Sequence, residues 1–246
     1  MIVIAHRGAS LTAPENTLPA FEQALDVGAD GIEFDVRVTA DGRLVVIHDD
    51  NLERITGDST RIADMTFDEV RRADVGRRRE WGARLQVPCV EEVIELASGR
   101  ARLFIELKAS WRDGEFRSAA PAAEAILPLV AGVPGVTLSS FDPLAVAAVR
   151  ALAPEIPTGI GCAEALPLDW CLQTAVSGGH EECHVSNGAV EVGFIRRAHD
   201  AGRRVLVWTV NEPSRLRELR DIGVDGVFTD DPAGARAACA PQVGTL

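Results

Sequence analysis

The chain has 246 residues, of which 46% are hydrophobic and 25% charged, a composition that excludes intrinsic disorder and suits one domain with a large core. Its 37 acidic and 25 basic residues give a net charge of −12, which disfavours binding to nucleic acid and to anionic membrane surfaces. No stretch reaches the roughly 18 apolar residues of a membrane span, so we expect no stable membrane insertion.

The cysteines and the N-terminus favour a reducing compartment. An odd number of cysteines without a C-x-x-C pair indicates free thiols rather than a disulfide framework or a zinc site. Residues Met1–Ala5 run directly into a strand pattern without a basic leader. We therefore expect a cytoplasmic location; the sequence leaves the oligomeric state open. The cysteines are Cys89, Cys162, Cys171, Cys183 and Cys239.

Strand and helix patterns alternate along the whole chain. The predicted strands are Ile2–Ala5, Gly31–Val36, Leu103–Leu107, Val136–Ser139, Pro157–Ile160, Glu182–Val185, Arg204–Trp208 and Gly226–Phe228. The predicted helices begin near Thr17, Glu91, Phe116, Pro143, Glu164, Val190, Pro213 and Pro232. Eight βα units predict an α/β fold, a closed (β/α)8 TIM barrel formed as a single domain by residues 1–246. An open doubly wound sheet is the structural alternative.

A small insertion interrupts this alternation after the second strand. Val36–Val38 and Arg43–Ile47 flank Asp41-Gly42, which predicts a β-hairpin. The stretch from about residue 51 to residue 88 is too long for an ordinary βα loop. We expect it to form a small inserted segment that lies over the barrel mouth. We interpret Arg77–Arg79 within it as a solvated face, and the residues from about Ala240 as a frayed end.

Acidic residues gather where a barrel places its chemistry, at the carboxyl ends of the strands. Glu33 and Asp35 are two residues apart and point to the same face, and Glu106 and Lys108 repeat this spacing. Three carboxylates in one barrel interior repel each other unless a cation joins them, and their oxygens suit Mg²⁺ or Ca²⁺. A purely structural Glu106–Lys108 ion pair is the alternative for the second pair.

Two histidines at neighbouring strand ends, His6 and His48, form the natural acid–base pair, because imidazole titrates near neutral pH. We take His6 as the base and His48 as the acid. Arg7 and Lys108, the only lysine in the chain, supply positive charge for a phosphate.

The remaining aromatic and histidine positions are less informative. Trp208 offers either an apolar wall for a substrate or simple core packing. His180, His184 and His199 are interpreted as surface or loop histidines, with His184 a reserve candidate because it stands at a strand end.

Together these segments resemble the glycerophosphodiester phosphodiesterase family, and the likeness covers almost the whole chain. The matching segments are Ala5–Gly8, Pro14–Thr17, Glu33–Val36, Val46–Asp49, Leu52–Arg54, Ile105–Lys108, Ser139–Phe141, Val207–Asn211 and Gly226–Asp230.

The resemblance implies a TIM barrel that hydrolyses small glycerophosphodiesters to an alcohol and sn-glycerol 3-phosphate. It implies His6 and His48 as the acid–base pair, and Arg7 and Lys108 as phosphate contacts. It also implies one bound Mg²⁺ or Ca²⁺ and a supporting pair of residues. In that picture the metal ligands are Glu33, Asp35 and Glu106; Trp208 contacts the glycerol, Glu15 orients the His or Arg cluster, and Asn16 caps the first helix.

Two other functions are compatible with the same residues. A lysophospholipase D or sphingolipid head-group phosphodiesterase would need an exposed apolar entrance for an acyl chain. A barrel that only binds polyol phosphates or a protein partner would be expected to have lost a metal or histidine position, and none is missing. The nucleophile is either water or the glycerol 2-hydroxyl, which would give a cyclic phosphate.

Overall fold

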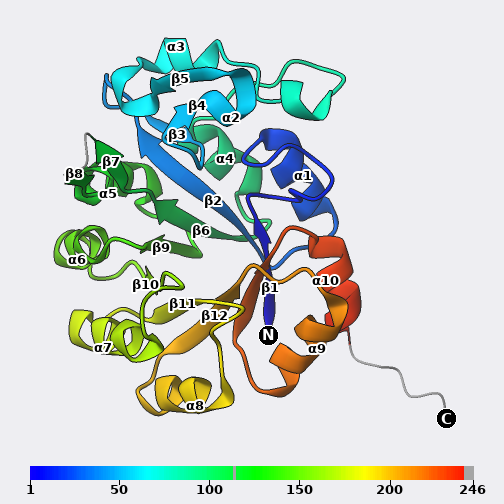
Figure 1. Ribbon diagram of the computed structural model, residues 1–246, viewed down its shortest axis with the longest axis vertical. Helices are drawn as coiled ribbons and strands as arrows, with labels where there is room; N and C mark the ends of the chain where they lie inside the picture. The colour runs from blue at the N-terminus through cyan, green and yellow to red at the C-terminus, as the bar shows by residue number, and fades with distance from the viewer. Residues whose placement is uncertain (113–114, 241–246) are drawn as a thin grey trace.

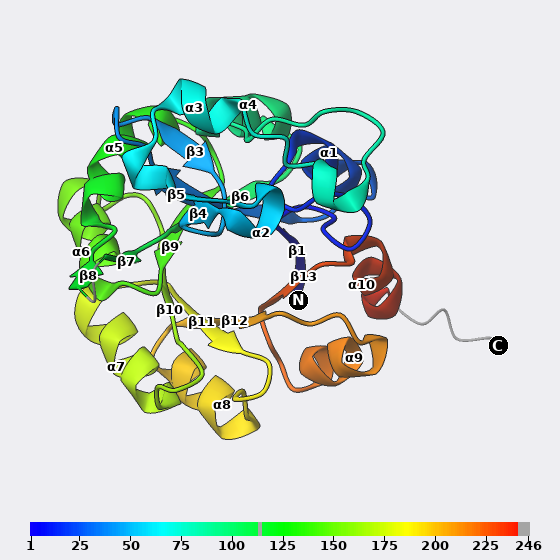
Figure 2. The same cartoon turned by 45° about the horizontal axis from the view of Figure 1, so that its top comes forward.

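The computed structural model describes residues 1–112 and 115–240, and these form a closed barrel of parallel strands (Figures 1 and 2). Strand β1 pairs with β13 on one side and with β2 on the other, which closes the sheet and rules out the open doubly wound alternative. The predicted (β/α)8 TIM barrel is therefore confirmed. In order around the barrel, its strands are β1 (Ile2–His6), β13 (Gly226–Thr229), β12 (Arg204–Trp208), β11 (Glu182–Ser186), β10 (Thr158–Gly161), β9 (Val136–Ser140), β6 (Arg102–Leu107) and β2 (Gly31–Val38).

Helices surround the strands on the outside, as Figure 2 shows. Outward-facing Ile32, Phe34 and Val36 of β2 belong to the core between sheet and helices, where Phe34 meets Phe21 edge-on. Within the described residues no helix combines the length and apolarity needed to cross a membrane. The outer helices are α1 (Leu18–Asp26), α4 (Val90–Ala97), α5 (Ala120–Val130), α6 (Pro143–Leu152), α7 (Leu168–Gly178), α8 (Val192–Asp200), α9 (Pro213–Asp221) and α10 (Pro232–Cys239).

Two helices begin later than predicted. Helix α5 starts at Ala120 because Phe116 belongs to a short antiparallel hairpin, β7 (Ser110–Arg112) and β8 (Glu115–Arg117). Helix α7 starts at Leu168 because Glu164 lies in the preceding loop, where its carboxylate accepts a hydrogen bond from the Ser186 hydroxyl.

The insertion after β2 builds a small layer beside the barrel mouth (Figure 1). The predicted hairpin is present, with β3 (Leu44–Val46) antiparallel to β2. It continues through β4 (Asn51–Leu52), α2 (Glu53–Thr56), β5 (Asp58–Arg61), η1 (Ile62–Asp64), α3 (Phe67–Arg71) and η2 (Arg77–Arg79). A separate apolar cluster holds this layer together: Val45, Ile47, Leu52, Ile62, Met65, Val70, Val75 and Val87.

The interpretation of Arg77–Arg79 as only a solvated face was incomplete. Arg79 is exposed, but its guanidinium donates hydrogen bonds to the carbonyl oxygens of Ser10 and Leu11 at 2.7 and 2.8 Å. These bonds tie the insertion to the loop after β1. Residues 241–246 of the predicted frayed end lie outside the described residues.

Candidate active site

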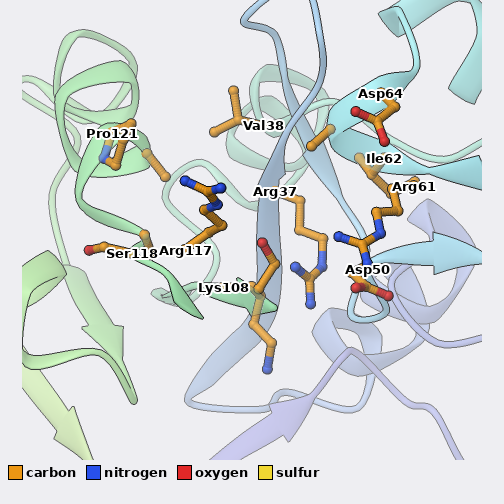
Figure 3. A pocket seen from close by; sticks show the side chains of 14 residues that line it. Arg37, Val38, Asp50, Arg61, Ile62, Asp64, Lys108, Arg117, Ser118 and Pro121 are labelled. Atoms are coloured by element: carbon orange, nitrogen blue, oxygen red, sulfur yellow. The ribbon is translucent and has the colours of Figure 1, made fainter. Parts of the chain in front are cut away.

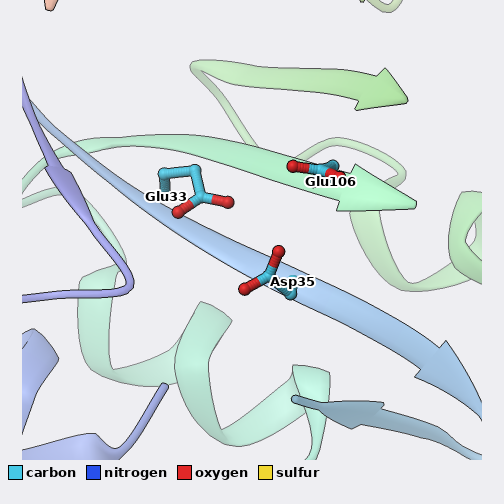
Figure 4. Close-up of side chains that lie close together, drawn as sticks. All are labelled: Glu33, Asp35 and Glu106. Carbon is cyan, nitrogen blue, oxygen red and sulfur yellow. The ribbon is translucent and has the colours of Figure 1, made fainter. Parts of the chain in front are cut away.

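The three predicted acidic residues converge inside the barrel mouth (Figure 4). Glu33 and Asp35 project from β2, and Asp35 is the register partner of Glu106 on the neighbouring strand β6. One oxygen from each carboxylate lies within 4.8 Å of the other two. Because Glu33 and Asp35 are also buried, this arrangement is costly unless positive charge compensates it.

Two basic side chains supply part of that charge. The Lys108 ammonium lies 2.6 Å from a Glu106 oxygen and 3.3 Å from an Asp35 oxygen. Arg7 places its Nε 3.2 Å from Asp35, and its backbone N–H donates to Glu33 at 2.9 Å. The Glu106–Lys108 contact is thus a real ion pair, but it forms one part of a larger charged cluster.

The backbone that positions Arg7 has an unusual conformation. Arg7 and Gly8 both have positive φ angles, 56° and 82°. A Cβ atom at Gly8 would lie 2.6 Å from the carbonyl carbon of Ala20, so the tight turn needs a glycine there. This turn brings the Arg7 N–H to the carboxylate of Glu33.

The pKa values show that the charge balance is incomplete. Burial and the neighbouring Asp35 carboxylate raise the pKa of Glu33 to about 8. Burial also acts to raise the pKa of Asp35, but Lys108 and Arg7 outweigh it and hold that pKa far below its ordinary value. Protein groups alone therefore favour the protonated form of Glu33 more than they would for an ordinary carboxyl. A hard divalent cation would restore its charge, so the donor set fits Mg²⁺ or Ca²⁺.

Each predicted catalytic histidine has one ring nitrogen held by a carboxylate. His6 Nδ1 lies 2.7 Å from Asp230, and His48 Nδ1 lies 2.8 Å from Asp49. Asn211 donates to the second oxygen of Asp230 at 2.8 Å. Such bonds fix the ring orientation and leave Nε2 of each imidazole for proton transfer.

These carboxylates were not among the predicted site residues. Asp49 directly follows His48, and Asp230 stands two residues after a predicted strand, so both carried a positional signal. The pairing of His6 with Asp230, however, joins the first and last strands of the barrel.

Glu15 and Arg54 link the loop after β1 to the insertion. Arg54 donates to Glu15 at 2.7 Å and to Asp49 at 2.5 Å. Glu15 also accepts from Arg7 at 3.0 Å, and its role in orienting the His or Arg cluster stays a prediction. Since Asp49 holds His48, Arg54 connects the insertion to a predicted catalytic residue.

Asn16 does not cap the first helix as predicted. Thr17 is the N-cap, and its hydroxyl accepts from the Ala20 N–H. The Asn16 side chain instead donates to Asp35 at 2.7 Å, and the Asp35 N–H donates back at 3.3 Å. Asn16 adopts a positive φ of 56°, outside helical geometry, and this turns its amide towards Asp35.

The site opens into a cavity of about 250 Å³ whose lining includes both histidines, Arg7, Glu33, Glu106 and Lys108. Trp208 and Phe141 form an apolar wall, with their rings 5.4 Å apart and perpendicular. The Trp208 indole donates to the His184 carbonyl at 3.2 Å. Trp208 therefore lines the cavity and also packs against its neighbours.

Two of the three histidines interpreted as surface or loop residues are buried, His180 in a loop and the reserve candidate His184 in strand β11. His180 is buried beside the hydroxyl of Thr158 at 2.9 Å. His184 is buried in the cavity floor and pairs with the equally buried Glu182 at 2.8 Å. His199 is at the surface, as expected, beside Asp225.

Comparison with known proteins agrees with this geometry. Residues 6–234 match the glycerophosphoryl diester phosphodiesterase family. A glycerophosphodiester phosphodiesterase from Bacillus altitudinis is 32% identical over 233 residues, covering 94% of both chains. One from Caldanaerobacter subterraneus is 32% identical over 239 residues, again covering 94% of each chain.

Solved structures show the same fold. A phosphodiesterase from Oleispira antarctica, in complex with the product sn-glycerol-3-phosphate, superimposes with a TM-score of 0.87 at 30% identity, covering 97% of this chain and 96% of that one. With the family matched over nearly its whole length, the chain belongs to the glycerophosphoryl diester phosphodiesterase family.

Proposed function

We propose that this protein hydrolyses glycerophosphodiesters to an alcohol and sn-glycerol 3-phosphate, using one divalent cation and the pair His6 and His48. The observation that carries the proposal is the convergence of three carboxylate oxygens within 4.8 Å of one another, in a cavity that both histidines line. The product named for the Oleispira antarctica relative supports the same substrate class.

The charged cluster suits a phosphodiester. Glu33, Asp35 and Glu106 would hold Mg²⁺ or Ca²⁺, which when bound would offset the negative charge that develops on the phosphoryl group. Lys108 and Arg7 line the same cavity and would hydrogen-bond the phosphoryl oxygens. Trp208 would pack against the carbon face of the glycerol.

The two histidines differ in pKa in a way that suggests their roles. Burial acts to lower the pKa of His6, but the hydrogen bond that its ring donates to Asp230 and the charge of Glu33 raise it above its ordinary value. Burial lowers the pKa of His48 below its ordinary value, and the Lys108 ammonium lowers it further. The negative charge of Asp35 acts in the opposite direction but does not outweigh them. We therefore assign His48 as the base and His6 as the acid, the reverse of the assignment made from the sequence.

In this scheme His48 takes the proton from the attacking hydroxyl as the new P–O bond forms. His6 gives its proton to the alkoxide that leaves as the old P–O bond breaks. The attacking group is water or the glycerol 2-hydroxyl, and in the second route water then opens the cyclic phosphate.

We also propose a cytoplasmic location for the protein and a small-molecule substrate. The five cysteines are free and four of them are buried, which suits a reducing compartment. The net charge of −12 argues against nucleic acid as a partner.

The substrate class can be tested with a panel of diesters assayed with and without chelator. We expect glycerophosphocholine and glycerophosphoglycerol to release sn-glycerol 3-phosphate, excess EDTA to abolish the release, and Mg²⁺ or Ca²⁺ to restore it. Full activity in excess chelator would contradict the carboxylate cation site. Turnover of lysophosphatidylcholine in preference to both diesters would support the lysophospholipase D alternative.

The histidine pair can be tested by substitution. His6→Ala and His48→Ala should each lower kcat by at least ~10²-fold, the usual range for loss of general acid–base catalysis. His199→Ala is the matched control, because His199 is exposed and paired with Asp225 in the outer part of the barrel. Turnover at the wild-type rate in either site variant would overturn the assignment.

The roles within the pair can be tested by the pH dependence of kcat/KM. Because Asp230 raises the pKa of His6, Asp230→Asn should lower that pKa. If His6 must be protonated, the alkaline limb of the pH profile of kcat/KM should move to lower pH in this variant. The value of kcat/KM should also fall about tenfold or more relative to the wild type.

Asp225→Asn, which alters the carboxylate beside His199, is the control and should leave the profile unchanged. A shift of the acidic limb instead of the alkaline limb in Asp230→Asn would show that His6 is the base.

A further inference from the structure

Figure 3 shows the side chains that line a second cavity, larger than the one that the histidines line. It has a volume of about 450 Å³ and lies between the end of β2, the insertion and the start of α5. Lys108 lines both cavities, so the two meet at the charged cluster.

The lining of this second cavity is basic, although the protein as a whole carries a charge of −12. Four of its lining residues are basic and two are acidic; outside the lining, Glu106 and Asp35 pair with Lys108, and Glu115 pairs with Arg117. The basic residues are Arg37, Arg61, Lys108 and Arg117, and the acidic residues are Asp50 and Asp64.

The arginines differ in how firmly they are held. Arg37 is fixed, because its guanidinium donates to the carbonyl oxygens of His48 and Ala109 at 2.8 and 3.2 Å. Arg117 pairs with Glu115 at 2.8 Å, but both side chains are largely exposed, and such pairs are weak.

Arg61 is the most available of these cations. Within residues 1–112 and 115–240, no ion pair or side-chain hydrogen bond involves its guanidinium. The side chain comes from the end of β5 in the insertion, and Figure 3 shows it extending towards Asp50 and Arg37. One guanidinium group can donate hydrogen bonds to two phosphate oxygens at once. Arg61, whose guanidinium has no such partner among the described residues, is therefore suited to an anionic ligand.

The two cavities match the two arms of a phosphodiester. With the phosphorus beside Lys108, one arm enters the smaller cavity, where the apolar wall of Trp208 and Phe141 suits a glycerol. The other arm, the alcohol that leaves, then enters the larger cavity.

We propose that the larger cavity binds the leaving alcohol and selects alcohols that carry a second phosphate group over cationic ones. The inference rests on the proposed function and names its substrate class. A phosphate on the alcohol would meet Arg61 and Arg117, whereas a quaternary ammonium would face like charge.

The test compares three diesters that differ in the charge of the alcohol: bis(glycerophospho)glycerol, glycerophosphoglycerol and glycerophosphocholine. We expect kcat/KM to fall in that order at low ionic strength, with at least a tenfold difference between the first and the last. Added salt should narrow the difference, because the arginines are partly exposed.

The double variant Arg61→Gln, Arg117→Gln should lower the ratio of kcat/KM for bis(glycerophospho)glycerol to that for glycerophosphocholine by about tenfold or more. Arg197→Gln is the matched control, since Arg197 is an exposed arginine on α8, paired with Asp169, and should leave the ratio unchanged.

The outcomes separate the two proposals. If all three diesters are hydrolysed with equal kcat/KM, or the double variant leaves the ratio unchanged, the inference is wrong while the proposed function stands. An equal change of the ratio in Arg197→Gln would also overturn it, because the effect would then come from net charge. If the protein hydrolyses none of the three, the proposed function fails and the inference fails with it.

Discussion

The crowding of Glu33, Asp35 and Glu106 is the constraint on which the rest of the site depends. Their oxygens lie within 4.8 Å of one another, and Glu33 and Asp35 are buried while Glu106 is partly exposed. At that separation two negative charges repel by roughly 3 to 4 kcal/mol for an effective dielectric constant near 20. The fold tolerates this because Lys108 and Arg7 contact the same carboxylates, and because a proton or a cation can neutralise Glu33.

The barrel supplies the rigidity that such a cluster needs. The parallel register of β2 and β6 sets Asp35 beside Glu106, and the closure of β1 onto β13 sets His6 beside Asp230. The insertion contributes through Arg54, whose bond to Asp49 links it to His48. A segment that lies outside the barrel thereby helps to orient a catalytic candidate and also forms one wall of the second cavity.

The sequence predicted the barrel and the acidic cluster because both follow from local periodicity. Alternation along one strand places Glu33 and Asp35 on the same face wherever the strand lies. Contacts that depend on distant segments were harder to predict. The sequence carried no signal for the pairing of His6 with Asp230, and the amide of Asn16 reaches Asp35 only because the backbone there leaves helical geometry. The burial of His184 was not predicted, because it depends on how side chains from several strands fill the barrel interior.

Anomalous diffraction from crystals soaked in Ca²⁺ would show whether these three carboxylates bind one divalent cation. We expect a single peak with an oxygen of Glu33, Asp35 and Glu106 each within about 2.3 to 2.6 Å. An active enzyme whose crystals show no peak there, or whose cation is bound by other residues, would contradict that expectation.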